Sequence, residues 1–426
     1  MIDRRHARFA ALLLFAGGCD TAGVAQNVAV RDSAGITIVE SSAPSWAAGE
    51  GWTVEPVPDF SVGGADAQGP HALHLVRGAA RLPDGTIALS DGGSGQVRLF
   101  TPEGAFMNAL GRTGRGPGEF SRATQVIAGS ADTVIVWDNS SMRIHWFGRD
   151  GTAHRAVAID RPFTRQMGGS VPVDSRLLPD LGVLVELREL APPEGAGESV
   201  TRALHHALWL QPGAEAWDTV RSFPGAEQMP VRGDVSVQGA TSTLVFAPVP
   251  LSPPHARRGR IAAGGNPARL CVGSQERAEI ACFDAAGAER RVRWTAAPVP
   301  VERAEITAWR ERTLVEDRGL PGSVEARRRT VDAMPMPAYR PPYDRIVLDH
   351  AGNLWAEVPR ALDAPPDAPI TYRVFDPEGA WLGEVVVPAV EILEIGAEHI
   401  LGLRRDAYDA EIVERFRLDR TGAPLP

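Results

Sequence analysis

The stretch LSDGGSGQVRLFTPEGAF (residues 89–106) and the stretch VWDNSSMRIHWFGRDGTA (residues 136–153) carry the same side-chain types at the same spacing, 47 residues apart. In each stretch an Asp is followed by an apolar residue six positions later, a Phe nine positions later and a Gly thirteen positions later. Self-similarity at a period of 20 to 50 residues is typical of arrays of small supersecondary units. The repeat therefore predicts a repetitive architecture.

The second half of this pattern, a large apolar residue four positions before a Gly, occurs again further along the chain. The further pairs are Trp209 and Gly213, Phe283 and Gly287, Phe375 and Gly379, and, more weakly, Leu418 and Gly422. The residues before each Gly read as half-buried strands, and the Gly supplies the positive φ of a tight turn. Six such hairpins predict an all-β fold, a six-bladed β-propeller of four-stranded antiparallel blades.

One segment breaks the strand pattern and predicts a helical insertion at residues 302–333. Ile306 and Trp309 lie at helical spacing, Gly-Leu-Pro-Gly at 319–322 ends the first helix, and Ser323 is a suitable N-cap for a second. The helix pair either covers the mouth of the propeller channel as a lid or packs Ile306 and Trp309 against the side of the propeller.

The N-terminal strand pattern predicts how the ring closes. Residues 32–426 are expected to form one domain, and Gly35–Ser41 has the alternation of a strand, whereas the last repeat is short. Pairing of this strand into the last blade would leave no exposed end, since closure removes sheet edges. The alternative is a separate edge strand or linker.

Residues 1–18 have the pattern of an export signal. Three arginines precede the short apolar run Phe9–Ala16, and small residues then lead to Cys19. The pattern resembles a bacterial lipoprotein signal, which implies lipidation of Cys19, a tether at 19–31 and an extracytoplasmic chain bound to a bacterial membrane only through its lipid. An ordinary cleaved secretory signal is the alternative, because Ala16 stands where the lipoprotein pattern has Leu.

Cys271 and Cys282 flank a polar turn between two strand-like segments. If the turn centres on Glu276 and Arg277, the two cysteines lie opposite each other across a hairpin, close enough for a disulfide. Two separate buried thiols are the alternative. A zinc site is not expected, because no second Cys or His pair occurs at ligand spacing.

The charge of the chain argues against nucleic acid as a partner. Its formal net charge is −9, and it has no basic tract of the kind that binds phosphate backbones. The sequence contains no lysine, which excludes Schiff-base and P-loop lysine chemistry.

The local motifs are best explained by structure. The glycine-rich segment 111–120 misses the spacing of known phosphate loops, so it is expected to connect two blades with Phe120 in the core between them. Asp91 and Asp138 occupy equivalent repeat positions, which indicates loop capping through side-chain to backbone hydrogen bonds.

Other polar clusters receive similar interpretations. His205 and His206 face opposite sides of a strand, so they do not bind one metal together. His71 and His74 are expected to be hydrogen-bonded loop residues. A surface loop at 246–260 carries three arginines that are expected to be solvated: Arg257, Arg258 and Arg260.

The segment RLFTPEGAFMNALGRTGRGPGEF (98–120) resembles the repeat of NHL-type propellers. The segments VRDSAGITIVES (30–41) and YDRIVLDHAGNLWAEV (343–358) resemble a group of bacterial secreted six-bladed β-propeller proteins, the TolB-like propeller group. The similarity covers residues 71–160 and 340–385. It implies a six-bladed ring, usually a binding scaffold, and provides no shared catalytic set.

Together these features predict a lipid-anchored, monomeric binding or scaffold module for a small molecule, a glycan or a protein. The alternative is a metal-dependent hydrolase or lyase resembling a lactonase, with its site in the central channel. No catalytic or cofactor-binding residue is predicted. A calcium or other divalent ion in the channel belongs to the alternative function, which needs three or more Asp, Glu, His or Asn side chains around one point.

Overall fold

The structure is a computed structural model of the 426-residue chain. It describes residues 27–129, 132–159, 169–190, 199–231, 235–238, 243–246, 250–315 and 323–422. Cys19 and the segments predicted as the signal peptide and most of the tether lie outside these residues. Strand β1 (Val28–Ser33) takes in the last residues of the predicted tether.

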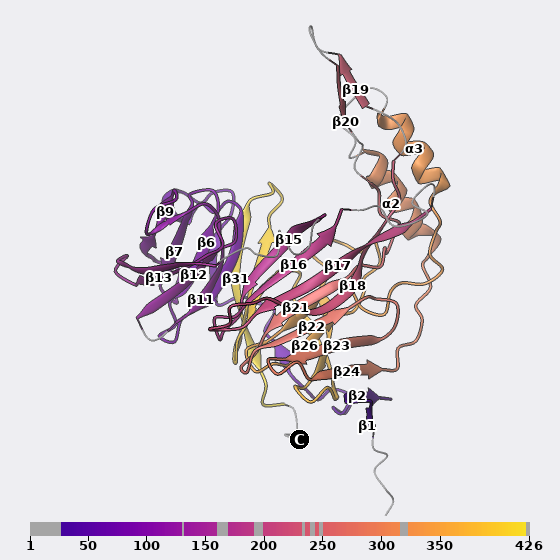
Figure 1. Cartoon of the computed structure of the whole chain (residues 1–426), viewed down its shortest axis with the longest axis horizontal. Helices are drawn as coiled ribbons and strands as arrows, with labels where there is room; N and C mark the ends of the chain where they lie inside the picture. Colours follow the sequence, from indigo (N-terminus) through magenta and orange to yellow (C-terminus); the bar gives the residue numbers. More distant parts are fainter. Residues whose placement is uncertain are drawn as a thin grey trace, which may run out of the picture.

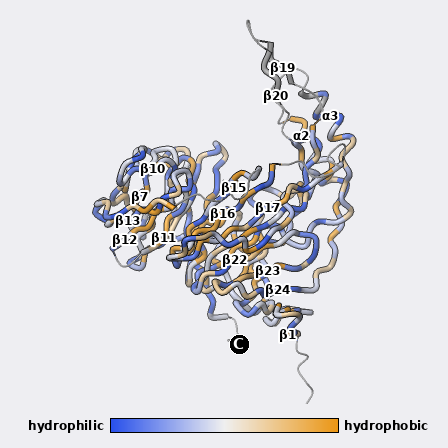
Figure 2. The backbone as a smooth tube through the Cα atoms, viewed as in Figure 1, coloured by the Kyte–Doolittle hydropathy of each residue, from blue (hydrophilic) through white to orange (hydrophobic). Residues whose placement is uncertain are grey.

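The described residues form six sheets of at least four strands, numbered here sheets 1 to 6 in chain order. Sheet 1 contains β5 (Val76–Arg81), β6 (Ile87–Asp91), β7 (Gln96–Phe100) and β8 (Phe106–Leu110); sheet 2 contains β11 (Ala123–Ala128), β12 (Thr133–Asp138), β13 (Arg143–Gly148) and β14 (Ala153–Ala158). Sheet 3 contains β15 (Ser170–Leu177), β16 (Val183–Glu189), β17 (Thr201–Leu210) and β18 (Asp218–Gln228); sheet 4 contains β21 (Arg260–Gly264), β22 (Arg269–Gly273), β23 (Glu279–Asp284) and β24 (Glu289–Trp294). Sheet 5 contains β25 (Ile346–Leu348), β26 (Leu354–Glu357), β27 (Ile370–Phe375) and β28 (Trp381–Val387); sheet 6 contains β29 (Glu391–Ile395), β30 (His399–Arg405) and β31 (Glu411–Asp419). Successive strands along the chain within each sheet pair antiparallel. Residues of high hydropathy are frequent along the strands of these sheets (Figure 2).

Each sheet packs on the next through a separate hydrophobic cluster. Phe120, for example, joins a cluster between sheets 1 and 2, and Trp137 joins the cluster between sheets 2 and 3. Further clusters link sheets 3 and 4, 4 and 5, and 5 and 6. A sixth cluster packs Leu401 and Val413 of sheet 6 against Val76 and Leu89 of sheet 1. The series of sheets therefore returns to its start, and the fold is a β-propeller.

The N-terminal chain closes this ring, but with a different strand from the one predicted. Strands β4 (Phe60–Gly63) and β3 (Thr53–Val54) pair antiparallel with β31 and complete sheet 6. The predicted closing strand, β2 (Ile36–Ser41), instead pairs parallel with β24 and places β1 at the outer edge of sheet 4. The prediction of closure through Gly35–Ser41 was wrong, because local alternation does not specify which edge a strand joins.

The repeat glycines form the expected hairpin turns in five of the six copies. Gly104 has φ +92° between β7 and β8, and Gly151 has φ +93° between β13 and β14. The three later pairs centred on Gly213, Gly287 and Gly379 also have positive φ. The sixth copy is different, because Gly422 follows β31 and the neighbouring strand comes from the N-terminal chain.

The glycine-rich segment is a connector between sheets 1 and 2, as predicted. It contains two short parallel strands, β9 (Arg112–Thr113) and β10 (Glu119–Phe120). The Glu119 carboxylate accepts hydrogen bonds from the backbone N–H groups of Arg115 and Gly116. These two backbone donors of the loop are therefore bonded to a side chain of the same loop.

The predicted helical insertion is present as α2 (Arg303–Val315) and α3 (Ser323–Ala333). Trp309 of α2 and Val331 of α3 pack with Met229 and Leu251, which form an isolated β-bridge after β18. We call α2, α3 and this bridge the cap. The cap stands beyond the ends of β17 and β18, near the hairpin β19 (Val235–Gln238) and β20 (Thr243–Phe246), rather than against the side of a sheet (Figure 1). The short 3₁₀ helix η1 (Gly69–His71) precedes β5.

Closure through β4 predicts a large effect of one buried substitution. Val62→Asp should lower the free energy of unfolding by about 3 kcal/mol or more, because it places an unpaired carboxylate in the cluster between sheets 6 and 1. Val57→Asp is the matched control, since Val57 is 75% exposed and lies just before β4. Urea unfolding of both variants measures the difference; equal midpoints would show that β4 does not close the ring.

Candidate functional site

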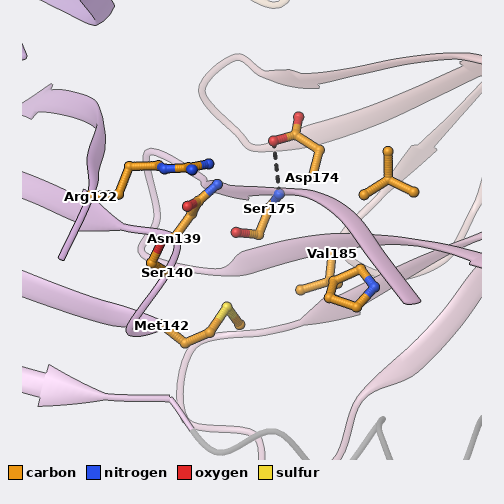
Figure 3. Close-up of a pocket in the computed structure, with 9 residues that line it drawn as sticks. Arg122, Asn139, Ser140, Met142, Asp174, Ser175 and Val185 are labelled. Atoms are coloured by element: carbon orange, nitrogen blue, oxygen red, sulfur yellow. Dashed lines mark hydrogen bonds between the residues drawn. The ribbon is translucent and has the colours of Figure 1, made fainter. Parts of the chain in front are cut away.

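A pocket of about 250 Å³ lies between sheets 2 and 3 (Figure 3). Its polar side chains come from the loops beside β11 and β12 and from β15, and its apolar side chains come from the β12–β13 loop, β15 and β16. The lining residues are Arg122, Asn139, Ser140, Met142, Pro172, Val173, Asp174, Ser175 and Val185. None of them was singled out from the sequence, because they lie up to 63 residues apart and only packing brings them together.

A buried carboxylate fixes one wall of the pocket. Asp138 is fully buried, and its two oxygens accept backbone N–H groups from Ser121, Arg122, Ser140 and Ser141. These bonds hold the β12–β13 loop against the start of β11. The pocket residues of this loop are therefore held in place before any ligand arrives.

A β-bulge shapes the opposite wall. The register of β15 against β16 shifts between Pro172 and Asp174, which turns Val173 outward. The Asp174 carboxylate accepts hydrogen bonds from the Ser175 backbone N–H and the Arg176 guanidinium at 2.9 Å each. On the sheet 2 side, the Trp137 indole N–H donates to Ser175. The two sheets are thus joined at the base of the pocket.

The pocket presents one cation without a protein partner. Within the described ranges, the Arg122 guanidinium makes no hydrogen bond or ion pair, since only its backbone N–H is engaged. Arg122 and Asn139 extend on the side facing Asp174 and Ser175, with Met142 and Val185 below them (Figure 3). This combination suits a small polar ligand with an anionic group and an apolar part.

A second polar cluster joins the cap to the propeller. The Glu305 carboxylate of α2 is buried and accepts hydrogen bonds from the His255 ring at 2.6 Å, the Arg340 guanidinium at 2.8 Å and the Leu362 backbone N–H. Burial alone would raise the pKa of Glu305, but these hydrogen bonds outweigh it and lower the pKa to about 2. Burial lowers the pKa of His255. The cluster anchors α2 to three separate loops.

The predicted capping by Asp91 and Asp138 and the hydrogen-bonded His71 ring are present. His74, in contrast, is exposed, and only its backbone is hydrogen-bonded within the described residues. Asp91 accepts the backbone N–H groups of His74 and Ser94, so Asp91 and Asp138 both cap loops. The His71 ring contacts the Gly104 carbonyl at 3.1 Å.

The arginines of the 246–260 loop differ from the prediction of solvated side chains. Arg257 pairs with Glu227, and Arg260 is largely buried and pairs with Asp344. Burial and neighbouring arginines lower the pKa of Arg260 to about 10. Of these three arginines, only Arg258 is exposed with no partner for its side chain in the described residues, as the prediction had it.

The two adjacent histidines of β17 point to different partners, as predicted. The His205 ring lies 2.6 Å from Glu186, whereas the His206 ring contacts Ser222 and Glu189. Cys271 and Cys282 occupy paired positions on β22 and β23, and their sulfurs are bonded.

Metal-ligand clusters and membrane-spanning helices are both absent from the described ranges. No three His, Cys, Asp or Glu side chains in them lie close enough together to hold a metal ion. None of the helices there is long and apolar enough to cross a membrane.

Comparisons with known proteins give distant structural matches. No protein-family profile and no curated protein matches the sequence. The chain resembles a DUF4221 family member from Bacteroides vulgatus (TM-score 0.42, 9% identity, 87% of this chain and 99% of that chain). It also resembles regucalcin, a calcium-binding protein from Agrobacterium tumefaciens (0.36, 9%, 88% and 96%), and a gluconolactonase from Xanthomonas campestris (0.36, 14%, 82% and 87%). At these values the strand topology, and not the likeness, carries the fold assignment.

The Glu305 cluster predicts acid sensitivity. The ionised Glu305 carboxylate contributes stability above its unfolded pKa of about 4.5, and this contribution is lost as the pH falls toward 2. The pKa of His255 is lowered in the folded state, so the folded state is also destabilised as the pH falls below about 6.5. Glu305→Gln should therefore lower the free energy of unfolding at pH 7 by about 2 to 3 kcal/mol, with a smaller deficit near pH 3. Denaturant unfolding from pH 3 to 8 measures this, with exposed Glu311→Gln on α2 as the control. A deficit that is constant with pH would contradict the assignment.

Proposed function

We propose that the chain is an extracytoplasmic binding protein whose ligand occupies the pocket between sheets 2 and 3. The observation that carries this proposal is the Arg122 guanidinium, which faces a preformed polar pocket and has no partner in the described part of the chain. Arg122 is exposed, and its side chain lines the pocket. Here Asp138 and the β15 bulge fix both walls around it.

The size and chemistry of the pocket suggest the class of ligand. Typical sites for drug-sized molecules hold about 300 to 1,000 Å³, so a pocket of about 250 Å³ suits a small metabolite. Arg122 favours a carboxylate or another anion, and Asn139 and Ser175 can donate or accept hydrogen bonds. Met142 and Val185 offer an apolar surface. A small organic acid or sugar acid meets these requirements.

The architecture that we propose is a ring of six blades, one for each sheet, closed by β4 on β31. Its support is the set of six hydrophobic clusters that link each sheet to the next. We also propose export and lipid anchoring through Cys19, on the strength of the N-terminal pattern, and a Cys271–Cys282 disulfide formed after export, since oxidising compartments favour that bond. A metal-dependent hydrolase or lyase has no ligand set among the described residues to support it.

Ligand binding can be tested with a defined panel of probes. Thermal unfolding of the protein would be followed with lactate, malate, gluconate, glucuronate, glutamate and inorganic phosphate, each at 5 to 10 mM, about 100 times a Kd of 50 to 100 μM. A ligand at 100 times its Kd stabilises the folded state by about 2.7 kcal/mol, so at least one probe should raise the Tm by several degrees. Arg122→Gln should abolish that shift, and exposed Arg31→Gln should not. A shift unaffected by Arg122→Gln, or none with any probe, would contradict the proposed site.

Lipid anchoring is tested on the full chain expressed in a bacterium. The protein should partition into detergent-extracted membranes, and the N-terminal peptide should begin at Cys19 with the mass of attached acyl chains. Cys19→Ser should leave the protein without this lipid mass. A wild-type chain with an unmodified N-terminal peptide would indicate the ordinary secretory signal instead.

A further inference from the structure

A serine, a histidine and a glutamate form a hydrogen-bonded chain across sheet 3. The Ser222 hydroxyl of β18 lies 2.8 Å from Nδ1 of His206 on β17, and Nε2 of His206 lies 3.0 Å from Oε1 of Glu189 at the end of β16. Leu187, His206 and Ser222 are direct partners across three adjacent strands, so they share one face of the sheet. The lining of the proposed ligand pocket includes none of Ser222, His206 and Glu189.

The hydrogen bonds determine which ring nitrogen carries the proton. An ionised carboxylate only accepts hydrogen bonds, so in the neutral ring Nε2–H donates to Glu189. Nδ1 is then unprotonated and accepts the hydroxyl proton of Ser222. This is the arrangement in which a histidine acts as a general base on a serine while a carboxylate holds the ring.

The neighbouring pair provides an internal comparison. The His205 ring on the opposite face of β17 also lies against a carboxylate, Glu186, at 2.6 Å, but no hydroxyl is bonded to it in the described chain. Cross-strand His–Glu pairing is therefore a structural feature of this sheet, and the serine is the additional element on the His206 side.

The serine is accessible whereas its base is shielded. Ser222 is exposed on the outer strand, and His206 is 7% exposed. Leu204, two positions before His206 on the same face, is 40% exposed and lies opposite Pro224. An acyl chain can lie along this apolar pair with its carbonyl over Ser222. Adjacent strands are about 4.8 Å apart, so Ser222 lies about 14 Å from Pro172 in the ligand pocket, across the row Pro172–Leu187–His206–Ser222.

We propose that Ser222, His206 and Glu189 form a second, hydrolytic site for esters of small acyl groups. Ser222 Oγ attacks the ester carbonyl carbon as His206 Nδ1 takes the hydroxyl proton. The carbon–oxygen bond to the leaving alcohol breaks, and the imidazolium returns the proton to that alcohol. Water then releases the acid from the acyl-serine by the same proton transfers. Glu189 is a positioning residue that stabilises the imidazolium.

The first measurement is covalent labelling. The folded protein is treated with a fluorophosphonate probe, which loses fluoride when a nucleophilic serine attacks its phosphorus, and the modified residue is located by mass spectrometry. Ser222 should be labelled in the native protein and not after denaturation. Ser61→Ala is the matched control, because Ser61 is an exposed serine of β4 with no histidine among its partners in the described residues.

The second measurement is hydrolysis of 4-nitrophenyl butyrate between pH 5 and 9. Ser222→Ala should reduce the rate to background, and His206→Asn should reduce it by at least about 100-fold, the range of general-base contributions. Glu189→Gln should lower the rate and move the acidic limb of the pH profile, on which protonation of the base limits the rate, to lower pH, because the imidazolium loses its carboxylate. This shift separates positioning from a merely structural role.

Three results would overturn the proposal. They are the absence of label on Ser222 in the folded protein, hydrolysis by Ser222→Ala at the wild-type rate, and labelling of His206→Asn at the wild-type rate. Circular dichroism of each variant shows whether it is folded. Ser222→Ala removes an exposed side chain and one hydrogen bond to His206, so it is expected to lower the Tm only slightly and to stay folded, and a loss of activity there reports chemistry.

Discussion

The pairing of β4 with β31 is the contact on which the rest of the structure depends. Sheet 6 has only three strands from the C-terminal part of the chain, and its next strand comes from a segment about 350 residues earlier. Joining ends this far apart costs about 5 kcal/mol from the logarithmic term of loop closure. The same strand places Phe60 and Val62 in the cluster that also contains Val76 and Leu89 of sheet 1. One segment thus completes a sheet and joins the last sheet to the first.

Both candidate sites involve sheet 3, whose strands are longer than those of sheets 1 and 2. Strands of sheets 1 and 2 have five or six residues, whereas β17 has ten and β18 has eleven. The longer β17 and β18 extend past His205 and His206, which still pair with residues of the hydrophobic clusters, and β18 leads to the β-bridge of the cap. Sheet 3 therefore bears the bulged wall of the pocket on β15 and the Ser222 chain on β16–β18.

The sequence predicted the features that local patterns determine. Glycines with positive φ marked five hairpins, the spacing of Cys271 and Cys282 indicated opposed positions, and Ser323 marked the start of α3. It did not predict contacts that depend on packing between distant segments. The alternation in residues 36–41 is the same whether that strand joins sheet 4 or sheet 6, and Glu305 gave no sign of its bonds to His255 and Arg340, which lie 50 and 35 residues away. Ser222 was missed for the same reason, since it lies 16 residues from His206.

The first two repeats differ in how the charge of their equivalent aspartates, Asp91 and Asp138, is compensated. In sheet 1, the Arg98 guanidinium forms an ion pair with Asp91 and donates hydrogen bonds to the carbonyls of Pro70 and Ala72. The equivalent position 47 residues later is His145, which is buried, has a pKa lowered by burial, and has neither ring nitrogen bonded in the described structure. A neutral ring cannot compensate Asp138, whose charge is satisfied by four backbone N–H groups instead. One of those groups belongs to Arg122. The Arg122 backbone N–H thus bonds the Asp138 carboxylate, while the Arg122 guanidinium has no partner among the described residues.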